Sequence, residues 1–146
     1  KLQRNKVKYI APFIHLIHTV DSERLLNQIN KEGDKNNRII NVLNQIKISN
    51  DPLKTGFEYS ELGDMFSGNI FLKYKFVKII GFMGIGSIDQ SKNDKEFKKI
   101  SDYFNEINKT HDLKYLSLGM SSDYKLAIKY NSNMIRIGSL IFGSRN

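Results

Sequence analysis

Two blocks near the end of the chain decide its fold class: Leu116-Ser117-Leu118-Gly119-Met120-Ser121-Ser122-Asp123 and Met134-Ile135-Arg136-Ile137-Gly138-Ser139. Each block predicts a short apolar strand that breaks at small residues and passes into a helical turn. Glycine lets a backbone approach a ligand closely, and the first N–H groups of a helical turn are free to bind an anion. Together the two blocks predict a cradle for a phosphorylated, ring-bearing ligand.

Upstream of these blocks, predicted strands alternate with predicted helices. The strands are predicted over residues 13–20, 39–48, 76–83, 115–117 and 134–137. The first helix is predicted to begin at a cap, Asp21 or Ser22, and to end at Gly33. A second begins near Ser60, and a third begins at a cap, Asn93 or Asp94. A fourth covers residues 123–130. This alternation favours parallel strands with right-handed crossovers. An open doubly wound sheet and a (β/α)₈ barrel both remain possible, and both place ligands at the carboxyl ends of strands.

Length and composition predict one domain over residues 1–146 with a packed core. The chain has 40% hydrophobic residues and a net charge of +8. A nucleic acid or an anionic membrane is one reading of that charge. However, the lysines are scattered along the chain rather than clustered, and arginines are few. We therefore expect neither a nucleic-acid partner nor a membrane partner.

Cysteine and histidine usage argues against a metal site. The chain has no cysteine, which excludes disulfides and thiolate ligands and fits a reducing compartment. The histidines, His15, His18 and His111, are too few and too far apart for metal ligation. No targeting signal and no bilayer-spanning apolar segment is visible in the sequence.

Two residues of the C-terminal blocks have chemical interest. Ser121 follows Gly119, but a nucleophile elbow needs a glycine where Asp123 stands, and no histidine follows. We therefore interpret Ser121 as a hydroxyl and N–H donor to an anion, or as part of an ordinary turn. Arg136 lies in an apolar strand, where it needs either a structural ion pair or a ligand. Gly138 stands two residues later, so it shares a strand face with Arg136. This shared face favours contact with a ligand over a structural ion pair. No catalytic residue is predicted.

Several segments, in this order, resemble the pyridoxal phosphate homeostasis protein family. They are Leu2-Gln3-Arg4-Asn5-Lys6, His18-Thr19-Val20-Asp21-Ser22, Ile48-Ser49, Lys54-Thr55-Gly56-Phe57, Gly81-Phe82-Met83 and the blocks 116–123 and 134–143. The last two blocks are the most specific. Asn131 stands where the family usually has glycine after a helix, which predicts a left-handed backbone there.

The resemblance implies a (β/α)₈ TIM-type barrel of the alanine racemase N-terminal type that binds pyridoxal 5′-phosphate (PLP). Ser121, Gly138 and Ser139 would hold the phosphate, and Arg136 would face the pyridine nitrogen. The implied role is non-catalytic: a cytoplasmic carrier or buffer in vitamin B6 homeostasis, expected to be a monomer, with PLP-dependent apoenzymes as possible partners. No metal is implied.

The resemblance also implies that part of the barrel lies outside this sequence. The family's Schiff-base lysine precedes the motif at Leu2–Lys6, so it is expected upstream of Lys1. About the first three βα units of the eight are expected to be missing. Two other functions remain open: a PLP-dependent racemase or decarboxylase of the same barrel type, and a basic nucleic-acid-binding module.

Overall fold

The computed structural model describes residues 1–143 and divides into two compact units. The first unit comprises Lys1–Ile46 and Thr55–Ile80, and the second comprises Lys47–Lys54 and the chain from Gly81 onward. Strand β3 contributes its first half to the first unit and its second half to the second unit. Each unit is described by itself below.

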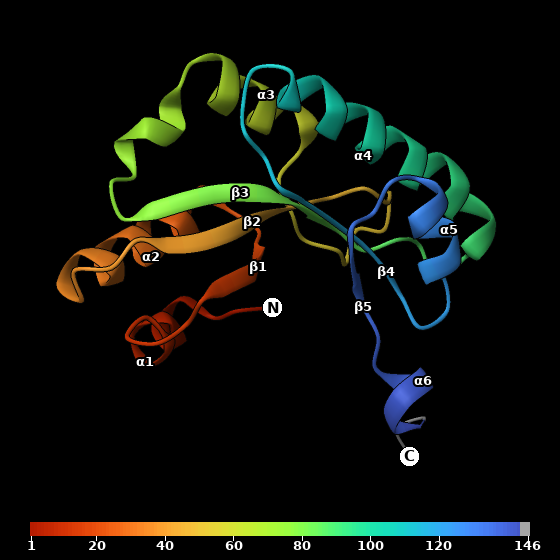
Figure 1. Cartoon of the computed structure of the whole chain (residues 1–146), viewed down its shortest axis with the longest axis horizontal. Coiled ribbons are helices and arrows are strands. Elements are labelled where there is room, and N and C mark those ends of the chain that lie inside the picture. Colours follow the sequence, from red (N-terminus) through yellow and green to blue (C-terminus); the bar gives the residue numbers. More distant parts are fainter. Residues whose placement is uncertain (144–146) are drawn as a thin grey trace. The chain divides into compact units, whose positions relative to one another are not determined.

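Helices and strands alternate along the chain (Figure 1). The strands are β1 (Leu16–Val20), β2 (Ile40–Ile46), β3 (Val77–Gly84), β4 (Tyr115–Met120) and β5 (Met134–Arg136). The α-helices are α1 (Val7–Ile10), α2 (Glu23–Lys35), α3 (Tyr59–Ser67), α4 (Asn93–Asn108), α5 (Tyr124–Lys129) and α6 (Ser139–Phe142). Three 3₁₀ turns complete the described elements: η1 (Arg4–Lys6), η2 (Ile70–Lys73) and η3 (Gln90–Lys92).

The strands follow one another in the sheet in sequence order, β1-β2-β3-β4-β5. The pairs β1–β2, β3–β4 and β4–β5 are parallel, as the alternation of strands and helices predicts. The expected α/β class with a parallel sheet is therefore confirmed. The sheet has five strands within the described residues, and the closed barrel of eight strands stays a prediction.

In the first unit, β1 and β2 carry the apolar core. Val20, Leu26, Ile29 and Ile40 are fully buried.

The predicted end of α2 at Gly33 is wrong, because the helix continues to Lys35. A Cβ at Gly33 would lie 2.8 Å from both the Arg38 carbonyl oxygen and the Phe76 Cβ. Glycine is thus present for close packing and not as a helix end.

In the second unit, α4 and α5 pack against β4. Helix α4 shows the predicted 3.6-residue stripe, with Phe97 and Ile100 fully buried against a core that includes Phe82 and Leu116. The predicted cap of α4 is wrong, since Lys92 is the N-cap and Asn93 is a fully buried first helical residue.

Two strand boundaries differ from the prediction by three residues, and the others by no more than two. The strand predicted from residue 13 begins at Leu16, because helix α1 and a turn occupy the residues before it. The strand predicted over 115–117 continues to Met120, which lengthens β4 up to the turn that carries Ser121. The left-handed backbone predicted at Asn131 is confirmed, with φ of 62°. Among the described helices, none has the length and apolar character needed to cross a bilayer.

Candidate functional site

Arg136 lies at the end of β5, and its side chain crosses the strands of the second unit. Nη1 donates to the Ser117 carbonyl oxygen at 2.9 Å and to Ser117 Oγ at 2.7 Å, on β4. Nη2 donates to the Gly84 carbonyl oxygen at 2.8 Å, at the end of β3. These contacts orient the planar guanidinium from two sides, because its donors have a rigid geometry.

Among residues 1–143, the contacts of Arg136 do not include the structural ion pair that was one of its two predicted roles. Within residues 1–143, its hydrogen bonds go to carbonyl and hydroxyl oxygens, and no carboxylate forms an ion pair with it. Burial lowers the pKa of Arg136, while the charge of Asp123 opposes that effect. An arginine in a protein stays protonated. The residue is therefore a positioned cation without a contacting anion.

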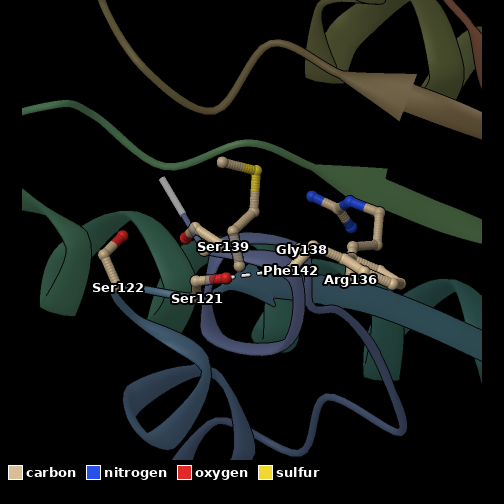
Figure 2. Close-up of a pocket in the computed structure, with 8 residues that line it drawn as sticks. Ser121, Ser122, Arg136, Gly138, Ser139 and Phe142 are labelled. Carbon is tan, nitrogen blue, oxygen red and sulfur yellow. Dashed lines mark hydrogen bonds between the residues drawn. The ribbon is translucent and has the colours of Figure 1, made fainter. Parts of the chain in front are cut away.

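The turn after β4 presents Ser121. Gly119 has φ of +87°, and a Cβ there would lie 2.7 Å from the Ala127 Cβ, so glycine is required at the start of this turn. Ser121 Oγ accepts a hydrogen bond from the Gly138 N–H at 3.2 Å (Figure 2). It also accepts one from the Leu140 N–H at 3.3 Å. The Ser121 hydroxyl thus joins the turn after β4 to the turn after β5.

The four predicted site residues meet at one cavity. Ser121, Arg136, Gly138 and Ser139 line a space of about 530 Å³ at the ends of β4 and β5 (Figure 2). The remaining lining residues of this cavity are Met120, Ser122, Phe142 and Gly143. A volume of this size accommodates a small-molecule ligand.

The lining chemistry of this cavity suits a ligand that carries an anionic group and a ring. It combines three serine hydroxyls, a guanidinium and the apolar side chains of Met120 and Phe142. Hydroxyl and N–H donors suit an anion, and the apolar side chains suit a ring. The described residues that line this cavity include no carboxylate, imidazole or amine to move a proton.

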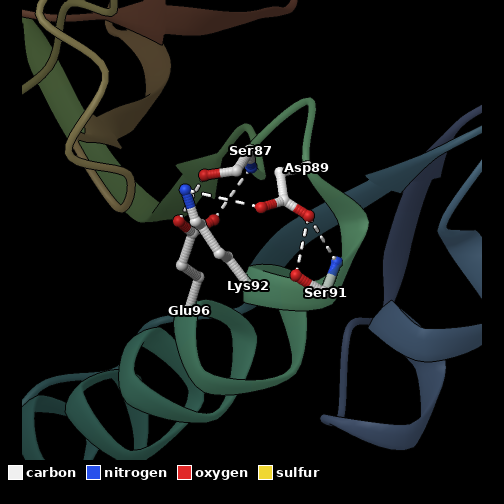
Figure 3. Close-up of polar contacts among 5 residues, drawn as sticks. All are labelled: Ser87, Asp89, Ser91, Lys92 and Glu96. Atoms are coloured by element: carbon white, nitrogen blue, oxygen red, sulfur yellow. Dashed lines mark hydrogen bonds and ion pairs between the residues drawn. The ribbon is translucent and has the colours of Figure 1, made fainter.

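The loop after β3 is held by Lys54 and by a glutamate of α4. Lys54 Nζ donates to the Ile85 carbonyl oxygen at 3.3 Å and also to that of Gly86. Farther along, the Ser87 N–H donates to Glu96 Oε2 at 2.8 Å (Figure 3). These contacts fix the segment whose first carbonyl, that of Gly84, accepts from Arg136.

A second cluster of hydrogen bonds holds the end of the same loop. Asp89 Oδ1 accepts from the Ser91 N–H at 3.2 Å and from Ser91 Oγ at 2.6 Å (Figure 3). Asp89 Oδ2 lies 3.4 Å from Lys92 Nζ. This pattern is a capped turn that leads into α4.

The site predicted from the sequence did not include Ser117 and Gly84, which accept the hydrogen bonds of Arg136. Ser117 is fully buried in an apolar strand, and a buried hydroxyl requires a hydrogen-bond partner. A serine at this position could therefore have indicated a polar contact. The Gly84 carbonyl gives no signal, because every residue except proline carries the same backbone groups. Met120 and Phe142 also line the cavity, but isolated apolar residues do not distinguish a site from a core.

Metal ligation finds no support in residues 1–143. No three histidine, aspartate or glutamate side chains of this part of the chain gather into a group that could hold a metal ion.

Comparison with proteins of known sequence places these features in a family. The pyridoxal phosphate homeostasis protein of Aquifex aeolicus is 34% identical over 149 residues, covering 99% of this chain and 64% of that protein. The chain therefore spans slightly less than two thirds of this relative's length. The resemblance stated from the motifs is confirmed.

Solved structures show the same arrangement. The structure of PipY from Synechococcus elongatus without PLP matches with a TM-score of 0.87 and 28% identity, over 98% of this chain and 68% of that one. PipY with PLP bound matches with a TM-score of 0.80 and 26% identity over the same shares.

The family comparison covers nearly the whole sequence. Residues 2–146 match the family described as alanine racemase, N-terminal domain. The parallel strands, the Arg136 anchorage and the serine-lined cavity all lie within the matched range. This chain belongs to the alanine racemase N-terminal domain family.

Proposed function

We propose that this chain is the PLP-binding part of a pyridoxal phosphate homeostasis protein, which carries or buffers the cofactor. The observation that carries the proposal is the guanidinium of Arg136, held by Ser117 and Gly84 at the border of a serine-lined cavity. The names of the Aquifex aeolicus relative and of the PLP-bound PipY structure support the same ligand.

The residues present fit PLP in charge and size. The hydroxyls of Ser121 and Ser139 would donate to the phosphate beside the backbone of Gly138. The Gly138 N–H itself donates to Ser121 Oγ, which leaves the Ser121 O–H free to donate to the ligand. A Cβ at Gly138 would meet nothing within 4 Å, so the backbone is open on that side. Arg136 would face the ring nitrogen, and the cavity of about 530 Å³ admits a ligand of this class.

Arg136 also supports a non-catalytic role. PLP, when bound, supplies an electrophilic carbonyl and an electron-accepting ring. The guanidinium is only a donor, so it keeps a facing ring nitrogen unprotonated and weakens the ring as an electron acceptor. The cavity lining among the described residues also brings no proton-transferring side chain. These two properties support binding without turnover.

The proposal extends to the whole protein. Upstream βα units would complete a (β/α)₈ barrel and supply the lysine that holds the cofactor, as the 64% coverage of the relative suggests. We further propose a cytoplasmic, monomeric protein that passes PLP to PLP-dependent apoenzymes.

The test is a PLP titration of the natural protein, followed by visible absorbance. We expect saturable binding, and an affinity at least about tenfold lower in Arg136→Met, because a charge-assisted contact is lost. Arg24→Met is the matched control: Arg24 is exposed on α2, and its replacement should leave PLP affinity unchanged. Equal affinities in wild type and Arg136→Met would remove the basis of the proposal.

Two further measurements test the alternative functions. Racemisation or decarboxylation of a labelled amino acid by the natural protein would establish an enzyme and contradict the carrier role. Salt-dependent retention on DNA or RNA that Arg136→Met leaves unchanged would favour a nucleic-acid-binding module.

A further inference from the structure

A polar pair outside the cavity lining links two loops of the second unit. Asn93 Nδ2, at the start of α4, donates to Asp123 Oδ2 at 3.1 Å. Asp123 directly follows Ser121 and Ser122, which line the cavity. The pair thus connects the β3–α4 segment to the turn that carries the proposed phosphate contact.

The Asp123 carboxylate is directed at this turn and not at its own helix. Asp123 is the N-cap of α5 but makes no side-chain capping bond, although aspartate at that position usually caps its helix. Its Oδ1 instead accepts from the Met120 N–H at 2.7 Å. The Asp123 N–H in turn donates a hydrogen bond to the Met120 carbonyl oxygen at 3.1 Å. The turn around Ser121 is therefore closed from both of its ends.

Asn93 is placed so that glycine is required opposite it. Its side chain is fully buried, and a Cβ at Gly86 would lie 2.8 Å from Asn93 Oδ1. Within residues 1–143, Oδ1 accepts no hydrogen bond, which makes a buried asparagine costly. An apolar side chain of the same shape would fill this space without that cost. The donor bond to Asp123 is the property that asparagine adds.

We propose that Asn93 and Asp123 are positioning residues for phosphate recognition. Asn93 orients the Asp123 carboxylate, the carboxylate sets the turn at Met120, and the turn places Ser121 against the N–H groups of Gly138 and Leu140. The inference rests on the proposed PLP site. It adds that selectivity for a phosphorylated ligand depends on two residues that do not touch the ligand.

The electrostatics of the site agree with this assignment. Although burial lowers the pKa of Arg136, the charge of Asp123 raises it. One carboxylate thus acts on both parts of the site: on the turn through hydrogen bonds, and on the guanidinium through its charge.

The experiment compares the affinities of the natural protein for PLP and for pyridoxal, which lacks the phosphate. Asn93→Leu keeps the side-chain shape and removes the bond to Asp123. Asp123→Ala removes the acceptor for the Met120 N–H, and Asp123→Asn restores it. Asn105→Leu and Asp102→Asn, at exposed positions of α4, are the matched controls. Thermal unfolding of every variant is measured alongside.

We expect the ratio of PLP to pyridoxal affinity to fall at least about fivefold in Asn93→Leu and Asp123→Ala, and to recover mostly in Asp123→Asn. A ratio that stays unchanged in the first two variants overturns the inference, whether or not the melting temperature falls. The same holds if both affinities decline equally, because that result indicates a structural role only.

Ser121→Ala separates this inference from the proposed function. A wild-type preference for PLP that Ser121→Ala removes, but that Asn93→Leu keeps, overturns the positioning role and leaves the binding site standing. A wild-type protein with no preference for PLP over pyridoxal overturns the proposed site and this inference together.

Discussion

Arg136 on β5 is anchored to Ser117 on β4 by one nitrogen that donates twice. Nη1 lies 2.9 Å from the Ser117 carbonyl oxygen and 2.7 Å from its Oγ. Ser117 pairs with Met134, and the register then shifts so that Met120, rather than Gly119, lies opposite Arg136. The side chain therefore reaches back along the sheet to Ser117. This anchor orients the cation, and no anionic side chain among residues 1–143 pairs with it.

Ser117→Ala tests this anchor. The variant removes one charge-assisted hydrogen bond, and we expect PLP affinity to fall by about 1.5 kcal/mol, or roughly tenfold. The Ser117 carbonyl oxygen still accepts, so the protein should remain folded. Ser101→Ala, at another buried serine in α4, should keep the wild-type affinity. Equal affinities in Ser117→Ala and Ser101→Ala would show that the hydroxyl does not position Arg136.

Gly119→Ala and Gly138→Ala form a matched pair. Gly119 has φ of +87°, and an added Cβ would lie 2.7 Å from the Ala127 Cβ and 2.8 Å from the Tyr124 Cα. We expect Gly119→Ala to lower the free energy of unfolding by about 2–4 kcal/mol through strain and overpacking. At Gly138 a Cβ meets nothing within 4 Å, so stability should change by less than about 0.5 kcal/mol.

Denaturant unfolding of both variants measures this difference. The Gly138→Ala variant should nevertheless bind PLP more weakly, because Gly138 lines the cavity. Similar unfolding free energies for the two variants would contradict the packing assigned to Gly119.

Ser132 joins β4 to the start of β5. Its buried hydroxyl accepts from the Leu118 N–H at 3.0 Å and lies 2.9 Å from the Leu118 carbonyl oxygen. Ser132→Ala leaves the Leu118 N–H without this acceptor, and we expect a loss of about 1–3 kcal/mol in the free energy of unfolding. Ser67→Ala, at the exposed end of α3, should unfold like the wild type. A Ser132→Ala variant of wild-type stability would contradict this role.

Asp21 should make stability depend on acid pH. Burial raises the pKa of the Asp21 carboxyl, but Lys1, Thr55 and Ser22 together outweigh burial and hold the pKa below the ordinary value of 3.8. A depressed folded-state pKa stabilises the protein above the unfolded-state pKa. This contribution is lost as the pH falls below about 4 and through the folded-state pKa.

Unfolding free energies between neutral pH and about pH 3 check this expectation, because the carboxyl titrates in that range. The Asp21→Asn variant should show a smaller loss of stability in acid than the wild type. Asp34→Asn, at an exposed position of α2, should keep the acid dependence of the wild type. An unchanged acid dependence in Asp21→Asn would exclude Asp21 as its source.

Local sequence patterns predicted the helices and strands whose buried face is set by residue spacing. The apolar stripe of α4 and the runs in β2 and β3 appear at the expected places, since burial of one face follows directly from residue spacing. The glycine and serine turns after β4 and β5 also lie where the blocks predict them. Parallel strands end at one edge of a sheet, so these turns were expected to meet.

Long-range packing explains the errors. Gly33 is a typical helix end in sequence, yet it lies within α2. Glycine is needed there because Phe76 and Arg38 leave no room for a Cβ. Asn93 is a typical helix cap in sequence, yet its side chain is buried and bonded to Asp123. In both cases the deciding contact comes from a distant part of the chain, which local propensity does not include.

The amino-acid sequence by itself determined the α/β class and the order of the elements, and it predicted Ser121, Arg136, Gly138 and Ser139 as one site. These follow from periodicity, turn chemistry and motif resemblance, which depend on neighbours along the chain. Only the tertiary structure decided that Arg136 bonds to Ser117 and Gly84, that Asn93 holds Asp123, and that a cavity of about 530 Å³ lies between the two turns. The physical reason is that strand pairing and register bring these groups together, and both depend on packing across the whole sheet.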